Sequence, residues 1–151
     1  MNRANLLLFL LIVLTFNSCS LNRVVTEQPY IYWPKPDLSM DTLGNGIVLF
    51  HNSNYIFDYF SALGPNKVNI KMDGVHLGQI DYGEFFMLEI DPGEHEFELE
   101  HRDMFMFRSS HKLMIDNETK VILVKPTVTS NKIEITNKLP DVRYLRPVYY
   151  E

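Results

Sequence analysis

Hydrophobic and polar residues alternate with a period of two along most of the chain, which is typical of β-strands. From Gly46 onward, short apolar or alternating runs are separated by turn residues, and no segment shows the apolar period of an amphipathic helix. The expected strands cover residues 47–50, 68–72, 75–77, 85–90, 94–101, 105–115, 121–128 and 133–136. The pattern predicts an all-β fold, a small antiparallel β-sandwich of about seven strands.

Asp73 and Gly74 mark the first predicted hairpin. This dipeptide tolerates the positive φ angles of a two-residue type I′ turn. The resulting cross-strand pairs are apolar on both sides: Met72 with Val75, and Ile70 with Leu77. The hairpin register is therefore consistent with one buried face.

Pro92 and Gly93 mark a second predicted hairpin, because proline presets φ and glycine takes a left-handed position. The returning strand alternates strictly over residues 94–101, so a shift by one residue would bury its glutamates. The expected core side carries Phe86, Leu88, Ile90, His95, Phe97 and Leu99, and the outer side carries Glu94, Glu96, Glu98 and Glu100. In this hairpin Glu89 lies opposite Glu96, and the two negative charges repel each other. The positive charges of Lys67 and Lys71 on a neighbouring strand are expected to offset this repulsion.

The last third of the chain predicts further strands and a packed tail. Residues 121–124 are apolar on both faces and are expected to form a central strand, after a turn at residues 116–118. The β-sandwich domain is expected to cover residues 46–138. The tail, residues 139–151, contains two prolines and three tyrosines and is expected to pack as an extended strap.

The first 18 residues have the pattern of a lipoprotein signal peptide. Arg3 supplies the positive charge, and residues 6–14 form an apolar run that is far shorter than the roughly 20 residues needed to span a bilayer. Residues 16–19, Phe-Asn-Ser-Cys, resemble a lipobox, in which Cys19 is acylated and becomes the new N-terminus. Phe16 and Asn17 depart from the usual residues, and simple secretion or an uncleaved anchor are the alternatives.

Residues 19–45 are expected to form a lipidated tether between the membrane and the domain. Pro29, Pro34 and Pro36 interrupt any regular element there. Residues 30–33, Tyr-Ile-Tyr-Trp, are too apolar for a spacer, so they are expected to dock on the domain or to meet a partner. Docking is the favoured interpretation.

Charge and cysteine content narrow the function classes. Without Arg3, 13 basic side chains remain against 19 acidic ones, a net charge of −6 on the mature chain. A nucleic-acid-binding protein would need a basic face, and no basic patch for anionic lipids follows Cys19. Because Cys19 is the only cysteine, no disulfide forms within the chain, and the fold depends on its core.

Two stretches, residues 68–78 and 86–95, resemble the motif order of PEGA-like domains: strand, Asp-Gly, short strand, Gly, strand and Pro-Gly-x-His. The chain is more similar still to a related family of bacterial lipoprotein-type domains of unassigned function. The resemblance covers about residues 47–136. The sequence departs from the pattern at Asp91, because PEGA-like sequences have other residues before Pro-Gly. It implies a small transthyretin-like or immunoglobulin-like β-sandwich on the envelope, and it supplies no catalytic residues.

The chain lacks a recognisable catalytic or metal-binding constellation. His95 and His101 are six residues apart on one strand, about 20 Å at about 3.3 Å per residue, so they cannot share a metal ion. His95 is better interpreted as a histidine that hydrogen-bonds to backbone near a turn. The four glutamates of residues 94–100 are expected to form a solvated sheet face, since a straight strand cannot surround calcium. Ser110 and His111 point to opposite faces of a strand, and no cofactor is predicted.

Aromatic clusters are the remaining functional candidates. Core packing explains most of the three clusters, which are residues 55–60, residues 103–107 and the tail tyrosines. Any exposed part would mark a partner or membrane-contact surface, and the candidate residues for it are Tyr55, Phe57, Tyr59 and Phe60. The leading hypothesis is a non-enzymatic, lipid-anchored protein that binds or scaffolds another envelope component, with an envelope protein as the expected partner. A lipoprotein that binds glycans or peptidoglycan fragments is the alternative hypothesis, and an uncharacterised enzyme is the third.

The residue after Cys19 favours an outer-membrane location. In enterobacteria an aspartate at this position is linked to retention of a lipoprotein in the inner membrane, and this chain has Ser20 there. The domain is expected to face the periplasm.

Overall fold

The computed structural model describes residues 26–27, 29–31, 38–53, 67–103, 105–127, 129–141, 143 and 145–148. The signal peptide, Cys19 and the aromatic segment with Tyr55, Phe57, Tyr59 and Phe60 lie outside these ranges. Within the ranges that are described, no helix has both the length and the apolar character needed to cross a bilayer.

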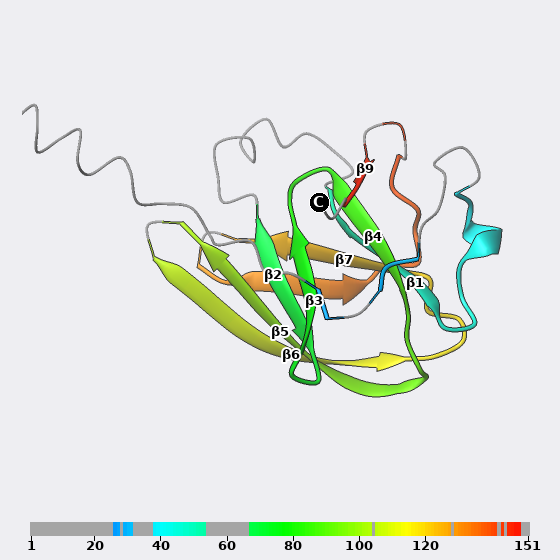
Figure 1. Cartoon of the computed structure of the whole chain (residues 1–151), viewed down its shortest axis with the longest axis horizontal. Helices are drawn as coiled ribbons and strands as arrows, with labels where there is room; N and C mark the ends of the chain where they lie inside the picture. The colour runs from blue at the N-terminus through cyan, green and yellow to red at the C-terminus, as the bar shows by residue number, and fades with distance from the viewer. Residues whose placement is uncertain are drawn as a thin grey trace, which may run out of the picture.

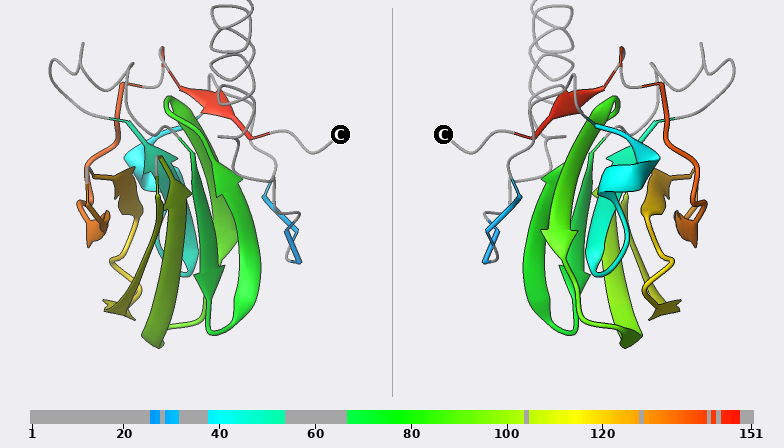
Figure 2. Two further views of the ribbon diagram at one scale, coloured as in Figure 1. Left: turned by 90° about the vertical axis from the view of Figure 1, so that its left-hand side faces the viewer. Right: turned by 90° about the vertical axis from the view of Figure 1, so that its right-hand side faces the viewer.

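The described residues form two β-sheets packed face to face, so the predicted all-β sandwich is confirmed (Figures 1 and 2). A single 3-10 turn at Met40–Thr42 precedes the first strand. The strands are β1 (Ile47–Asn52), β2 (Val68–Met72), β3 (Val75–Ile80), β4 (Glu84–Glu89), β5 (Gly93–Arg102), β6 (Met106–Ile115), β7 (Val121–Pro126), β8 (Asn131–Ile135) and β9 (Arg146–Pro147). Short β9, in the tail, was not expected as a strand.

One sheet has five strands in the order β8-β7-β1-β4-β9, and the other has four in the order β3-β2-β5-β6. The four-stranded sheet is antiparallel, but the five-stranded sheet is mixed, because β1 pairs with β7 and β4 with β9 in parallel. The antiparallel pairing expected for the sandwich thus holds throughout the four-stranded sheet, and the five-stranded sheet adds two parallel pairs to it. β7 lies between β8 and β1, which confirms that residues 121–124 belong to an inner strand.

The predicted Asp73-Gly74 hairpin is present, with φ of 51° and 82° at the two turn residues. Its register differs from the prediction beyond the first pair. Met72 lies opposite Val75 as expected, but Ile70 lies opposite Gly78 because a β-bulge interrupts the pairing. Gly78 has a φ of 117°, a conformation that glycine adopts without the steric cost of a side chain. Leu77, the expected partner of Ile70, stays fully buried.

The predicted Pro92-Gly93 hairpin is wrong, because the chain crosses there from one sheet to the other. β4 pairs with β1, and β5 pairs with β2 and β6. Gly93 has a φ of 158°, close to extended rather than left-handed. Glu89 lies opposite Ile47 and Glu96 opposite Lys112, so the expected Glu89–Glu96 pair does not form.

The predicted core faces are nevertheless correct, because β4 and β5 meet across the core instead of along an edge. Phe50 lies between the sheets, with its ring centroid 5.1 Å from that of Phe86 and 6.0 Å from that of Phe97. Leu88, Ile90 and Leu99 belong to the same buried cluster. Aromatic contacts of this kind add to the stabilisation that the burial of apolar area provides.

A second cluster covers the outer side of the five-stranded sheet. Its sheet residues include Leu49 and Met87, and Leu38, Leu43 and Leu145 cover them from outside the sheet. The described part of the tail therefore packs over the sheet and forms β9 beside β4. Leu38 and Leu43 also show that the end of the predicted tether is part of the folded domain.

Residues 26–27 and 29–31 pack against β3 and β4 (Figure 2). The ring of Tyr30 stacks on Phe86 with centroids 4.6 Å apart, and its hydroxyl donates to the carbonyl of Leu77 at 2.7 Å. The Ile31 N–H donates to the Met87 carbonyl at 2.9 Å. Docking of Tyr30 and Ile31 is confirmed, and the expected tether over residues 19–45 is too long. At most the residues before Thr26 separate Cys19 from the domain.

Candidate functional site

His95 lies near the start of β5 and has a structural role there. Its Nδ1 lies 2.6 Å from Asp73 Oδ2, and its Nε2 donates to the Asp91 carbonyl at 2.8 Å. Asp73 Oδ1 also accepts the Glu96 N–H at 2.9 Å. The β2–β3 turn is thereby fastened to the crossing between the sheets, which confirms the interpretation of His95 as a backbone-bonding histidine.

Both ring nitrogens of His95 face acceptors, which favours the charged imidazolium. Burial alone lowers the pKa of His95, but the hydrogen bonds to Asp73 and Asp91 and their negative charge raise this pKa above its ordinary value. The same hydrogen bond to His95, followed by that from Glu96, lowers the pKa of Asp73. These shifts describe a structural ion pair near the surface.

His101 belongs to a buried polar network at the opposite end of β5. Its Nδ1 lies 2.7 Å from Asn131 Oδ1, and its ring stacks on Phe107 with centroids 5.0 Å apart. Asn131 Nδ2 donates to the carbonyls of Leu99 at 3.2 Å and Phe107 at 3.4 Å. This network ties β8 of one sheet to β5 and β6 of the other. The sequence places His101 on the core face but does not reveal Asn131 as its partner.

Within the described part of the chain, no group of three His, Cys, Asp or Glu side chains is arranged to hold a metal ion. Ser109 and His111 lie two residues apart on β6, with Ser109 Oγ 2.9 Å from His111 Nε2. Among the described residues, His111 has no ion pair with a carboxylate that would orient its ring as in a catalytic triad. Ser110 turns to the other face, as predicted.

The glutamates of β5 face outward, as predicted, and most are matched by partners on β6. Arg108 Nε donates to Glu100 at 2.6 Å, and Lys112 Nζ donates to Glu94 at 2.9 Å. Ser110 donates its hydroxyl to Glu96. The cations of both ion pairs are mostly exposed, so each contributes only a little stability. The expectation of a solvated sheet face is confirmed.

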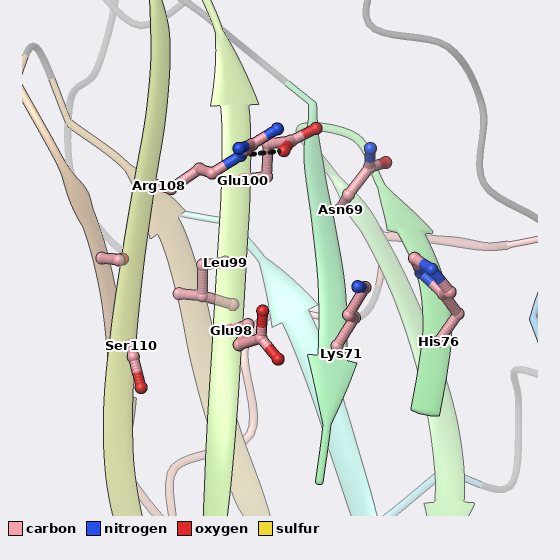
Figure 3. Close-up of a pocket in the computed structure, with 9 residues that line it drawn as sticks. Asn69, Lys71, His76, Glu98, Leu99, Glu100, Arg108 and Ser110 are labelled. Atoms are coloured by element: carbon pink, nitrogen blue, oxygen red, sulfur yellow. Dashed lines mark hydrogen bonds and ion pairs between the residues drawn. The ribbon is translucent and has the colours of Figure 1, made fainter. Parts of the chain in front are cut away.

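A hollow of about 520 Å³ opens on this outer face (Figure 3). Four strands contribute to it: β2, β3, β5 and β6. Its lining residues are Asn69, Lys71, His76, Glu98, Leu99, Glu100, Arg108, Ser109 and Ser110. The sequence singles out only some of these residues, the glutamates as a solvated face and Lys71 as a compensating charge.

Lys71 and Glu98 are the two charges of the hollow that are left without an ion pair among the described residues. They lie directly opposite each other on β2 and β5, and in Figure 3 both side chains lie over the same stretch of sheet. Arg108 and Glu100, by contrast, neutralise each other at the upper rim. The hollow therefore presents one ammonium and one carboxylate that a ligand can engage.

Asn69 is held in a fixed orientation beside these charges. Its Oδ1 accepts a hydrogen bond from Gln79 Nε2 at 2.8 Å, and both side chains are largely buried. The amide nitrogen of Asn69 is then the atom that remains for a ligand. A rigid donor next to Lys71 suits an anionic group, because both contribute hydrogen-bond donors to the same region.

Exposed apolar side chains occur at three places on the described surface. Phe105 is 69% exposed in the β5–β6 turn, Met106 is 44% exposed at the start of β6, and Met114 is 61% exposed near the other end of β6. Tyr82 is exposed in the turn between β3 and β4. Ser53 and Lys67, which flank the predicted partner segment, belong to the same end of the sandwich as Tyr82 and Phe105.

The sequence matches no protein-family model, and neither the curated proteins nor the solved structures contain a match. The resemblance to PEGA-like domains therefore stays a prediction.

Proposed function

We propose that the chain is a non-enzymatic, lipid-anchored envelope protein whose hollow binds another component of the envelope. The sequence support is the signal-peptide pattern that ends at Cys19 and the lack of a recognisable catalytic motif. The observation that carries the binding role is the pair of Lys71 and Glu98, two opposite charges that face one hollow without closing on each other. Such groups provide both polar recognition and orientation for a ligand.

A rigid sheet supports this role better than a loop would. β2 pairs with β5 from Asn69 to Met72, and inward-facing residues of the two strands, such as Ile70 and Phe97, are fully buried. The positions of Lys71 and Glu98 are thus set by the core, so little ordering is needed when a ligand binds.

The glycan-binding alternative depends on other residues. Sugar recognition commonly uses the flat faces of aromatic rings, and the lining of the hollow contains no Tyr, Trp or Phe among its described residues. Glycan binding at Tyr55, Phe57, Tyr59 and Phe60 stays a prediction, as does an envelope protein partner at that surface.

The proposal is tested by crosslinking in intact cells that express the full chain. A photo-reactive amino acid at position 71 is expected to give a discrete adduct with an envelope component, lipid or protein. The matched control carries the same group at Lys132, an exposed lysine on β8 of the opposite sheet. Equal labelling at positions 71 and 132 would contradict a binding role for the hollow.

A further inference from the structure

The hollow lies beside Thr26 and Glu27, the first described residues of the chain. The Glu27 N–H donates to the carbonyl of His76 at 2.9 Å, and His76 is one of the residues that line the hollow. Seven residue steps separate Cys19 from Thr26. At about 3.5 Å per residue, that connection spans no more than about 25 Å even when fully extended. A chain acylated at Cys19 therefore keeps the hollow close to the bilayer surface.

The outward-facing residues of β2, β5 and β6 around the hollow carry no net charge. By register, its cations are Lys71, Arg102, Arg108 and Lys112, and its anions are Glu94, Glu96, Glu98 and Glu100. Four positive and four negative side chains cancel. A surface built for anionic lipids would carry an excess of lysine and arginine, so this face is better suited to a headgroup that carries both charges.

Two exposed methionines lie on the same face, one near each end of the row that β6 contributes. Met106 and Met114 alternate in register with Arg108, Ser110 and Lys112, and both are more than two-fifths exposed. Apolar side chains around a polar hollow are a combination that suits the boundary between headgroups and acyl chains.

We propose that the hollow binds the phosphoethanolamine headgroup of phosphatidylethanolamine from the bilayer that carries the anchor; this inference rests on the lipid anchoring and the binding role proposed above. The Lys71 ammonium and the Asn69 amide donate to the phosphate, and the Glu98 carboxylate accepts from the lipid ammonium. Lys71 and Glu98 stand opposite each other on β2 and β5. The negative phosphate of the headgroup therefore faces Lys71 while its positive ammonium faces Glu98. No covalent step is involved.

The test uses the full, acylated chain in vesicles of phosphatidylglycerol and measures calorimetric binding of soluble glycerophosphoethanolamine. Saturable binding is expected, with a clear preference over glycerophosphoglycerol, which lacks the ammonium. Lys71→Met is expected to weaken binding by at least about tenfold, the usual cost of a charge-assisted hydrogen bond. Glu98→Gln is expected to abolish the preference for glycerophosphoethanolamine while the phosphate still binds. Lys132→Met, on the other sheet, is the matched control and should change neither value.

A second arm tests whether the bilayer is the source of the headgroup. When phosphatidylethanolamine is mixed into the vesicles, the soluble headgroup is expected to bind at least about tenfold more weakly, because the lipid already fills the hollow. An unchanged affinity would overturn the membrane source and assign the hollow to a soluble phosphoethanolamine ligand. Equal binding of glycerophosphoglycerol, or no binding of either compound, would overturn the headgroup proposal. Acylation of Cys19 and the crosslink at position 71 are measured separately. A failure of the anchored binding role can therefore be distinguished from a failure of the headgroup proposal.

Discussion

Replacing Asn131 by leucine is expected to lower the free energy of unfolding by about 3–5 kcal/mol, because leucine removes one partner from each of three buried groups. Those groups are the imidazole of His101 and the carbonyls of Leu99 and Phe107. His101 is fully buried and Asn131 nearly so, so water cannot replace the lost hydrogen bonds without opening the core. Chemical denaturation of the full chain measures the loss, and the expected decrease in Tm is roughly 10–20 °C.

Lys132→Ala is the matched control for this substitution. Lys132 is the next residue on β8, it is exposed, and it pairs only with Glu134 at the surface in the described structure. Its replacement is expected to change the free energy of unfolding by less than about 1 kcal/mol. If Asn131→Leu were as mild as this control, the network between β8 and the other sheet would contribute little to stability.

Acidification from pH 7 to pH 4 is expected to destabilise the domain by about 3 kcal/mol through His51 alone. His51 is fully buried on β1, its Nδ1 lies 2.8 Å from Ser53 Oγ, and burial lowers its pKa from 6.5 to about 4. The unfolded chain takes up a proton below pH 6.5, whereas the folded chain resists protonation until about pH 4. Stability is therefore retained above pH 6.5 and lost as the pH falls from 6.5 toward 4.

The contribution of His51 is isolated by comparison with His51→Gln, which has a similar length but no titratable ring. The free energy of unfolding of this variant should fall less between pH 7 and pH 4, by about the amount assigned to His51. Other groups, such as Asp73 and His95, titrate equally in both proteins. Parallel pH profiles for the two proteins would show that His51 is not held neutral by burial.

Alternation in the sequence identifies which side of each strand is buried, but it does not identify the neighbouring strand. Residues 86–90 and 94–99 have the same pattern whether they form a hairpin or face each other across a sandwich, since both arrangements bury the same side chains. The Asp73-Gly74 turn is predictable because its positive φ angles demand particular residues. The bulge at Gly78 is not, because one glycine within a strand is compatible with several local geometries.

The hollow was not predictable from the sequence for a related reason. Asn69, Lys71, His76 and Glu98 come from three strands, and they gather only because β2 lies between β3 and β5. The sequence shows Lys71 as one of several charges that balance glutamates. The fixed amide beside the Lys71 ammonium depends on the pairing of Asn69 with Gln79, which links residues on two strands.

The docking of Tyr30 and Ile31 constrains the proposed lipid anchor. Tyr30 packs against the core beside Phe86, so these residues are part of the sandwich and not a free spacer. If Cys19 carries the proposed lipid, so short a connection would keep the domain at the membrane surface, where the outer face of its four-stranded sheet would meet headgroups.

The intact mass of the chain, purified from a membrane fraction, determines whether Cys19 is the acylated N-terminus. We expect an N-terminus at Cys19 that carries fatty acid, and a Cys19→Ser chain that lacks the added mass and leaves the membrane fraction. A soluble cytosolic protein that begins at Met1 and carries no lipid would contradict it.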